Sequence, residues 1–341
     1  MLAAGLAGGV LARALGTPMP FMLGALAVSA LSAGLGGHLY PRDYLFPARL
    51  RLLFIGIIGV AIGARVNAGV LTQGWAFGAS LIAVSLFVVL AQGLNFAIFR
   101  RLGRLDAATA WFAGSPGGLI EAVTMGEAAG GDVRLLTLLQ FMRIILVVTV
   151  LPFALSIWHG GPVGSAAGLG GGAAPGDPAG LALVIALAIA GSFIGMRMRL
   201  PAGQLTGPLI LAALLRLSGW ADLGYPGWLM AAAQVVVGVS LGVRFHGVGR
   251  RLLLKALGLS LSSVTAMLLL GAGLAWGVHL ATGLPFVVLL ISYAPGGVTE
   301  MGLVAISLNA TPTLVAMHHL YRITLTVLLL SLARRLGVLG R

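Results

Sequence analysis

The chain has 341 residues, of which 59% are hydrophobic and only 9% are charged, and its mean hydropathy is +1.05. A soluble domain keeps far more charge on its surface, so this composition excludes a soluble globular protein and predicts an all-α polytopic membrane protein. The 52 glycines favour closely packed and interrupted helices over a polar-lined β-barrel. Cysteine is absent, which excludes disulfides, iron–sulfur clusters and thiolate metal sites.

The net charge of +13 would suggest nucleic-acid binding in a soluble chain. Here the arginines stand singly or in pairs at the ends of apolar segments, which is the pattern of cytoplasmic topology signals. We therefore expect no nucleic-acid partner and a multi-pass membrane protein.

Apolar segments follow one another along the whole chain. In the first half they lie at about 2–15, 17–37, 50–66, 76–99, 107–129 and 135–157. In the second half they lie at about 180–196, 201–215, 226–243, 253–278, 284–308 and 312–333. A Gly/Ala-rich stretch without lysine or arginine separates the two sets. This pattern predicts a first membrane repeat at 1–159, a linker at 160–180 and a second membrane repeat at 181–341.

Both ends of the two halves carry matching residues. The hexad Pro116-Gly117-Gly118-Leu119-Ile120-Glu121 recurs 179 residues later as Pro295-Gly296-Gly297-Val298-Thr299-Glu300, and the same offset carries Arg143 onto Arg322. At an offset of 183, residues of the first half match the second: Ala7, Gly8, Pro18, Gly24 and Leu26 match Ala190, Gly191, Pro201, Gly207 and Leu209. The halves are therefore predicted to be homologous repeats.

The placement of positive charge predicts how the halves are oriented. If the fifth segment of each half is re-entrant and returns to the side of the membrane from which it entered, each half has five spans. The two halves then have opposite orientations in the membrane, an inverted arrangement. Sixteen lysines and arginines then lie on the cytoplasmic side and three, Arg13, Arg65 and Arg216, on the other. If the fifth segments span fully, the Arg244–Lys255 cluster lies outside. The inverted arrangement is favoured, and it is typical of secondary transporters, although some inverted-repeat proteins are channels.

The fifth segment of each half is predicted to be broken. In the first half, residues 107–114 and 119–129 form half-helices around a turn from Ser115 to Gly118. Irregular backbone at membrane depth must line a cavity or be buried in protein, and the start of the second half-helix attracts anions. Either Ser115, Pro116, Gly117 and Gly118, with Pro295, Gly296, Gly297 and Thr299, form a binding site, or the glycines are hinges used only for packing.

The charged residues near the breaks allow two interpretations each. Glu121 and Glu300 either offset the dipole of their own half-helix or bind a proton or cation. Arg143 and Arg322 lie about nine residues inside their apolar segments. They either pair with the glutamate of the same half or hold a carboxylate or phosphate of the solute.

Three further polar residues are candidates. His319 lies beside His318, but neighbouring helix positions point about 100° apart and cannot easily share one metal ion. No His/Asp/Glu cluster has ligand spacing, so we expect neither a metal nor a cofactor. Gln204 and Thr206 either reach the cavity or cap a loop.

The paired Pro-Gly-Gly…Glu segments, the stretch Gly16-Thr17-Pro18-Met19-Pro20 and its counterpart Gln204-Leu205-Thr206-Gly207-Pro208-Leu209 resemble the AbrB duplication family of bacterial membrane proteins over essentially the whole chain. Members carry labels such as ammonia monooxygenase and regulator, and some resemble components of transport systems. The resemblance implies the internal duplication but no catalytic residues. Copper or iron oxygenation requires clustered ligands, which six scattered histidines do not supply.

We expect a secondary transporter of about ten spans plus two re-entrant segments that works by alternating access. Its expected partners are membrane lipid, a small anionic solute and a coupling proton or sodium ion, and a homo-oligomer is compatible with the sequence. Two alternatives stay open: a membrane-bound monooxygenase, and a channel or regulatory subunit that acts with a partner transporter.

Overall fold

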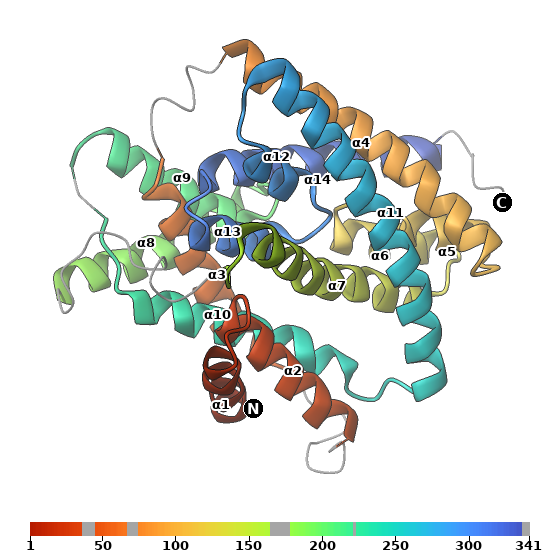
Figure 1. Ribbon diagram of the computed structural model, residues 1–341, viewed down its shortest axis with the longest axis horizontal. Coiled ribbons are helices and arrows are strands. Elements are labelled where there is room, and N and C mark those ends of the chain that lie inside the picture. The colour runs from red at the N-terminus through yellow and green to blue at the C-terminus, as the bar shows by residue number, and fades with distance from the viewer. Residues whose placement is uncertain (36–44, 67–73, 164–177, 221–222, 336–341) are drawn as a thin grey trace. The chain divides into compact units, whose positions relative to one another are not determined.

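The computed structural model describes residues 1–35, 45–66, 74–163, 178–220 and 223–335. Within these ranges the chain forms fourteen α-helices and no β-strand (Figure 1). Six helices are long and apolar enough to cross a membrane: Gly74–Arg101, Val133–Trp158, Pro178–Arg197, Gly227–Phe245, Arg250–Thr282 and Pro312–Ala333. The prediction of an all-α polytopic membrane protein is confirmed.

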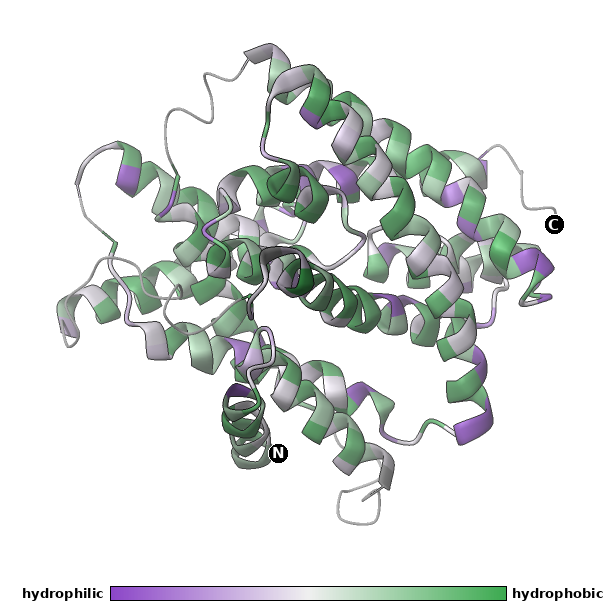
Figure 2. Ribbon diagram, in the orientation of Figure 1, coloured by the Kyte–Doolittle hydropathy of each residue, from purple (hydrophilic) through white to green (hydrophobic). Residues whose placement is uncertain are grey.

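The outward-facing side chains of the long helices are apolar. Along α4 (Gly74–Arg101), the large side chains of Trp75, Ile82 and Val89 are exposed. Figure 2 shows that hydrophobic residues dominate the helices, whereas hydrophilic residues gather mostly near helix ends. A soluble protein rarely exposes so much continuous apolar surface, and a bilayer is the solvent that accommodates it.

The helices pack into two units that do not follow the two sequence halves. Unit 1 consists of Met1–Thr72, Thr149–Val248 and Thr299–Ala316, and unit 2 of Gln73–Val148, Gly249–Val298 and Met317–Arg341. Each unit therefore combines helices from both halves. Residues 164–177 of the predicted linker lie outside the described residues, and the predicted repeat boundaries stay a prediction.

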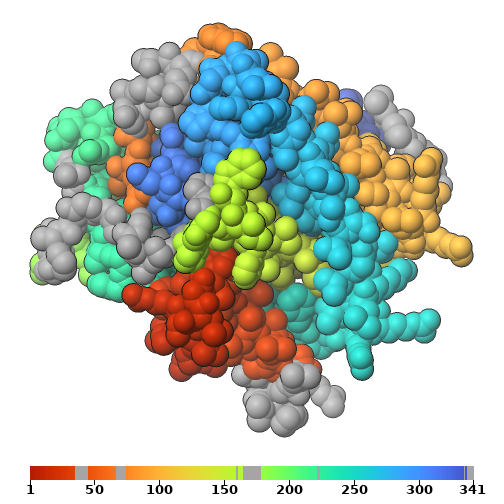
Figure 3. Space-filling model, viewed as in Figure 1, coloured from red at the N-terminus to blue at the C-terminus, as the bar shows by residue number. Residues whose placement is uncertain are grey.

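Unit 1 is built on glycine contacts between helices. Its complete elements are α1 (Leu2–Ala14), α2 (Pro20–Leu35), α3 (Ala48–Gly63), α8 (Pro178–Arg197), α9 (Gly203–Leu217), α10 (Gly227–Gly242) and η4 (Val243–Phe245). It also holds α7 (Val133–His159) from Thr149, α13 (Val298–Ser307) from Thr299 and α14 (Pro312–Arg335) up to Ala316. A Cβ on Gly24 would collide with the backbone of Gly8, and one on Gly207 with that of Gly191. Hence α1 packs directly on α2, as Figure 3 shows in red, and α8 packs on α9 in the same way.

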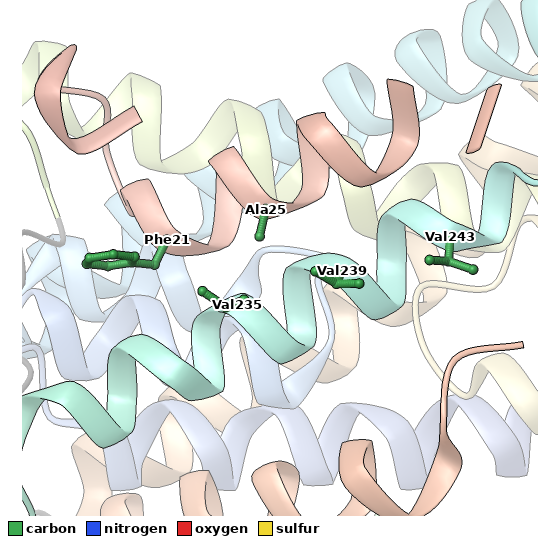
Figure 4. Packing of buried hydrophobic residues seen from close by; sticks show 5 residues of the cluster. All are labelled: Phe21, Ala25, Val235, Val239 and Val243. Atoms are coloured by element: carbon green, nitrogen blue, oxygen red, sulfur yellow. The ribbon is translucent and has the colours of Figure 1, made fainter. Parts of the chain in front are cut away.

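Helices from different halves also pack together in unit 1. Helix α2 lies against α10, and α9 lies against α3. Gly238 and Gly242 of α10 meet the backbone of α2, while Gly59 and Gly63 of α3 meet the backbone of α9. Around the first of these contacts, buried side chains of α2, α10 and the following η4 form a hydrophobic cluster: Phe21, Ala25, Val235, Val239 and Val243 (Figure 4).

Unit 2 holds the interrupted helices. Its elements are α4, α5 (Ala107–Ala113), α6 (Leu119–Ala128), α7 (Val133–His159) up to Val148, α11 (Arg250–Thr282), α12 (Phe286–Tyr293) and α14 (Pro312–Arg335) from Met317. The 33-residue α11 runs beside α4, and α12 packs against both (Figure 1). Polar side chains of α4, α7 and α14 face the interrupted helices within this unit.

The helix bounds repeat with the sequence. Helices α3 and α6 span Ala48–Gly63 and Leu119–Ala128, and 179 residues later α10 and α13 span Gly227–Gly242 and Val298–Ser307. Helices α1, α2 and α9 have 13, 16 and 15 residues, fewer than the roughly 20 that cross a bilayer. The opposite orientation of the halves and about five spans in each stay predictions.

Candidate functional site

The first predicted break is present. Helix α5 ends at Ala113 and α6 begins at Leu119, with Gly118 as the N-terminal cap residue. Gly118 has φ +61°, a left-handed conformation that glycine adopts without strain. A Cβ at this position would also lie 3.1 Å from Cγ2 of Val327 on α14. Both backbone angle and space therefore require glycine at the start of α6.

The first broken segment turns back on itself. Thr109 lies in the first turn of α5, and its Oγ1 accepts a hydrogen bond of 2.7 Å from the backbone N–H of Asp132, which follows α6. An unbroken helix would separate these residues by about 35 Å at 1.5 Å per residue. The first segment is therefore a helical hairpin, as the inverted arrangement requires.

The N-terminus of α5, at the end of the hairpin away from the break, is capped by a side chain. Oδ1 of Asp106 accepts a 2.8 Å hydrogen bond from the backbone N–H of Thr109. Burial acts to raise the pKa of the Asp106 carboxyl, but the hydrogen bonds from Thr109 outweigh burial and the pKa is lowered. The carboxylate therefore stays ionised and stabilises the positive end of α5.

Side chains from neighbouring helices bind the carbonyls that the break leaves without helical partners. From α4, Gln92 Nε2 donates to the Trp111 carbonyl at 2.8 Å, and Asn95 Nδ2 donates to the Gly114 carbonyl at 2.8 Å. A helix ends with four carbonyls that lack intrahelical partners, and lipid cannot bind them. These two amides supply part of what water supplies in a soluble protein.

Helix α7 binds the remaining carbonyls at the end of α5. Gln140 Nε2 donates to the carbonyls of Phe112 and Ala113 at 2.9 and 3.2 Å, and also to Ser115 Oγ at 2.8 Å. Arg143 Nη1 donates to the carbonyl of Ser115. Together with the amides of α4, these groups satisfy every carbonyl from Trp111 to Ser115. We call Gln140 and Arg143 the first clasp.

The second break is held by matching positions of α14. His319 Nε2 lies 3.0 Å from the Ile291 carbonyl, and because a carbonyl can only accept, this nitrogen carries the hydrogen. Arg322 Nη1 donates to the Ala294 carbonyl, and its Nη2 donates to that of Gly296 at 2.6 Å. We call His319 and Arg322 the second clasp.

The two clasps share one geometry. Gln140, Arg143, His319 and Arg322 each bind a carbonyl that lies 28 residues earlier in the chain. The 179-residue offset aligns Gln140 with His319 as it aligns the two arginines, but the sequence did not predict that these side chains bind the backbone of the breaks. In both clasps the partner is the backbone of the break.

The arginines and glutamates do not form the expected pairs. Among the described residues, neither arginine makes a salt bridge with the glutamate of its own half, because the guanidinium groups bind backbone carbonyls instead. The half-buried Glu121 lies over the start of its own helix, with Oε2 3.4 Å from where a Cβ on Gly118 would be. Glu300 is buried in unit 1, where it interacts with its own backbone N–H and electrostatically with Arg51.

Both clasps leave buried polar atoms without partners. Arg143 and Arg322 are 5% and 1% exposed, and they are near enough to interact electrostatically. Nε of each arginine, Oε1 of Gln140 and Nδ1 of His319 are buried without a hydrogen-bond partner among the described residues. Two buried guanidinium groups, each with an unbound Nε–H donor, form a site whose positive charge a bound anion would neutralise.

The first break also contacts α14, the helix that holds the second break. A Cβ on Gly117 would lie 3.6 Å from Cα of Ile323, the residue after Arg322, and 3.4 Å from Oγ1 of Thr326, one turn beyond Arg322. Thus Pro116–Gly118 and the Pro295–Gly297 turn both adjoin α14 within unit 2.

The remaining candidates lie elsewhere or have other partners. In unit 1, Thr206 Oγ1 donates to the Pro201 carbonyl at 2.6 Å, and the Gln204 carbonyl accepts from Ser192 Oγ at 2.9 Å. The Thr206 bond favours the loop-capping interpretation for that residue, whereas the bond at Gln204 involves only its backbone. Thr299 is buried and begins the part of α13 that belongs to unit 1. Across the described ranges, no three or more His, Cys, Asp or Glu side chains are grouped to hold a metal ion.

Sequence reasoning missed three side chains that hold the first break: Gln92, Asn95 and Gln140. A signal was present. Gln92 and Asn95 are three residues apart, as are Gln140 and Arg143, so each pair lies on one face of an apolar helix. Paired polar residues at that spacing in a membrane segment indicate a common polar partner.

Comparison with known proteins places the chain in one protein family. The family model described as transition state regulatory protein AbrB matches residues 30–337. The Escherichia coli (strain K12) protein named "Putative regulator AbrB" is 26% identical over 308 residues, which cover 85% of this chain and 83% of the relative. "Uncharacterized protein YhjN" of Bacillus subtilis (strain 168) is 25% identical over 348 residues, covering 95% and 88%.

Proposed function

The chain belongs to the AbrB family, and on that premise we propose that it is a secondary transporter of a small anion in the bacterial inner membrane. Transport is by alternating access and is driven by a proton or sodium gradient. The observation that supports this proposal most directly is the pair of buried arginines, Arg143 and Arg322, each clasping the backbone of one interrupted helix.

An anion suits the charge of this site. The two guanidinium groups are buried within electrostatic range of each other, and each keeps an unbound Nε–H. A bound carboxylate, sulfonate or phosphate would neutralise this charge. A neutral solute would leave the buried guanidinium charges uncompensated.

Transport suits the architecture. Interrupted helices at matching positions of two halves are a recurring feature of secondary transporters, where the breaks surround the substrate near the middle of the membrane. Alternating access also requires two parts that can move as bodies, and the helices divide into two packing units, each with elements of both halves. The absence of a nucleotide-binding motif from the sequence favours coupling to an ion gradient.

Purified protein in proteoliposomes tests the proposal with radiolabelled acetate, succinate and phosphate as probes. Saturable uptake that collapses when the imposed gradient is dissipated supports a transporter, and empty liposomes give the background. Uptake that does not saturate indicates a channel. Stoichiometric copper or iron in active protein, together with oxygen consumption, would overturn the proposal in favour of the monooxygenase.

A second candidate function rests on the printed name of the Escherichia coli relative, which describes a regulator. In that case the chain acts as a membrane subunit that controls a partner transporter. Uptake by the purified chain alone contradicts this candidate, whereas uptake that requires a co-purifying membrane protein favours it.

A further inference from the structure

The two clasps differ in one chemically decisive atom. At the first break Gln140 Nε2 binds the Phe112 carbonyl, and at the second break His319 Nε2 binds the Ile291 carbonyl at the matching position. Both side chains donate through Nε2 and leave one buried acceptor unbound, Oε1 in the glutamine and Nδ1 in the histidine. An amide oxygen does not bind a proton near neutral pH, but an imidazole nitrogen does.

The surroundings of His319 oppose a positive charge on its imidazole. Its side chain is 0% exposed, and Arg322 and His318 both interact with it electrostatically, with Arg143 acting on Arg322 in turn. From α4, Ser80 Oγ binds His318 Nε2 at 2.6 Å, and from α12 the Tyr293 ring lies 6.1 Å from the His318 ring. These neighbours bring positive charge and neutral dipoles toward the imidazole, but no carboxylate is among them.

An anion beside Arg322 would reverse this balance. Its negative charge compensates the guanidinium, so the cost of a second positive charge on His319 falls. The Nε2–H group still donates its hydrogen bond to the Ile291 carbonyl, so protonation of Nδ1 leaves the second clasp intact. Nδ1 then becomes a second donor that the anion can accept.

We propose that His319 Nδ1 is the proton-binding site that couples anion binding to the proton gradient. The inference rests on the proposed function and specifies its coupling ion: one proton enters from water onto Nδ1 with each anion, and both leave on the other side. The first clasp cannot perform this role because Gln140 stands where His319 stands in the second. Coupling is thus carried by one half of a duplicated site.

The variant His319→Gln tests the inference with little risk to folding. Glutamine at this position can donate from Nε2 to the Ile291 carbonyl as Gln140 does to Phe112, so the second clasp is kept without its titratable atom. His318→Gln is the matched control, because it removes the neighbouring imidazole and leaves His319. The thermal stability of both variants in detergent shows whether they fold.

Anion binding is measured as the increase in the thermal stability of the protein in detergent when acetate, succinate or phosphate is added, at several pH values. If one proton binds with each anion, the affinity of the wild type rises about tenfold per unit fall in pH, beyond any change in H319Q. Changes in the protonation of the anion itself are common to both proteins and cancel in this comparison. In proteoliposomes, H319Q should lose uptake driven by a proton gradient while retaining exchange of anion for anion.

Each failure has a distinct result. If no probe anion stabilises or crosses with the wild type, the anion-transporter proposal is contradicted. If the wild type transports but H319Q retains the same pH dependence and proton-driven uptake, only the role of His319 is contradicted. Loss of proton coupling in H318Q with coupling retained in H319Q would assign the proton to the other histidine and overturn the inference.

Discussion

Arg322 donates a hydrogen bond to the backbone carbonyl of Ala294, the residue immediately before the second Pro-Gly-Gly. Arg143 makes the matching bond to Ser115, the residue before the first. An unbound carbonyl in an apolar interior costs several kcal/mol, and a buried guanidinium alone costs more. Each group therefore removes part of the cost of the other, which explains why the chain keeps an arginine and a helix break together in both halves.

Replacement of Arg322 by lysine should weaken the second break. A lysine has one charged head and cannot bind the Ala294 and Gly296 carbonyls with the planar fork that Arg322 uses. We expect Arg322→Lys to lower the free energy of unfolding by about 3 kcal/mol, on the scale of charged hydrogen bonds, and to abolish uptake. Arg335→Lys, at an exposed position of the same helix, should change stability by less than about 0.5 kcal/mol. Equal melting temperatures for the two variants in detergent would contradict the role of the second clasp.

Two buried glutamines should respond oppositely to the same substitution. Gln140→Leu deprives the Phe112 and Ala113 carbonyls of their donor, so we expect a loss of about 1–3 kcal/mol of stability. Gln234 in α10 is equally buried, but neither of its amide atoms has a hydrogen-bond partner among the described residues. Gln234→Leu should therefore leave stability unchanged or raise it. Denaturation of both variants in the same detergent measures the difference, and a large loss in Gln234→Leu would reveal a bound partner.

Replacement of glycine by alanine should change stability differently at closely packed and at open positions. Gly207→Ala places a methyl group against the Gly191 carbonyl, where backbone lies on both sides and neither helix can yield locally. We expect a loss of about 1–3 kcal/mol, as for overpacking of a dense interior. The control is Gly258→Ala in α11, where nothing lies within 4 Å of the added carbon and alanine favours the helix by about 0.5–1 kcal/mol. Stabilisation of both variants to the same degree would mean that helix propensity and not close packing dominates, and would contradict the prediction.

The two glutamates should differ in their importance for transport. Glu300 is buried and interacts with Arg51, whereas Glu121 is half-buried over the start of its own helix. A charge in a buried environment is less screened, so we expect Glu300→Gln to reduce the initial rate of uptake more than Glu121→Gln. The latter should cost only about 0.3–1 kcal/mol of helix stability. Normal uptake by both variants would show that the carboxylates serve only their own helix dipoles.

The inverted orientation can be measured with single cysteines, because the chain has none of its own. A cysteine at Ser165 in the linker should react with a membrane-impermeant maleimide in intact cells. A cysteine at Arg197 should react only after the membrane is opened, since the charge distribution places that loop inside. Labelling of both positions in intact cells would contradict the predicted topology.

The break positions were predictable because they depend on local chemistry. Proline and glycine interrupt a helix wherever they stand, and the sequence alone placed the half-helices within one residue of α5 and α6. The partners of the arginines were not predictable in this way. Both sequence-based interpretations assigned them another charged group, whereas the guanidinium groups bind backbone carbonyls that no residue type encodes.

The sequence by itself determined the membrane class, the matching residues of the two halves and the position of each break, since composition and residue spacing are properties of the chain before it folds. Only the tertiary structure decided that the first broken segment returns to Thr109 and that α2 packs on α10 and α9 on α3. It also showed that the aligned residues Gln140 and His319 both donate to a backbone carbonyl of a break. These features arise from contacts between residues far apart in the chain. They are set by the need to satisfy buried backbone groups and to pack glycine faces closely, and many different sequences can meet those needs.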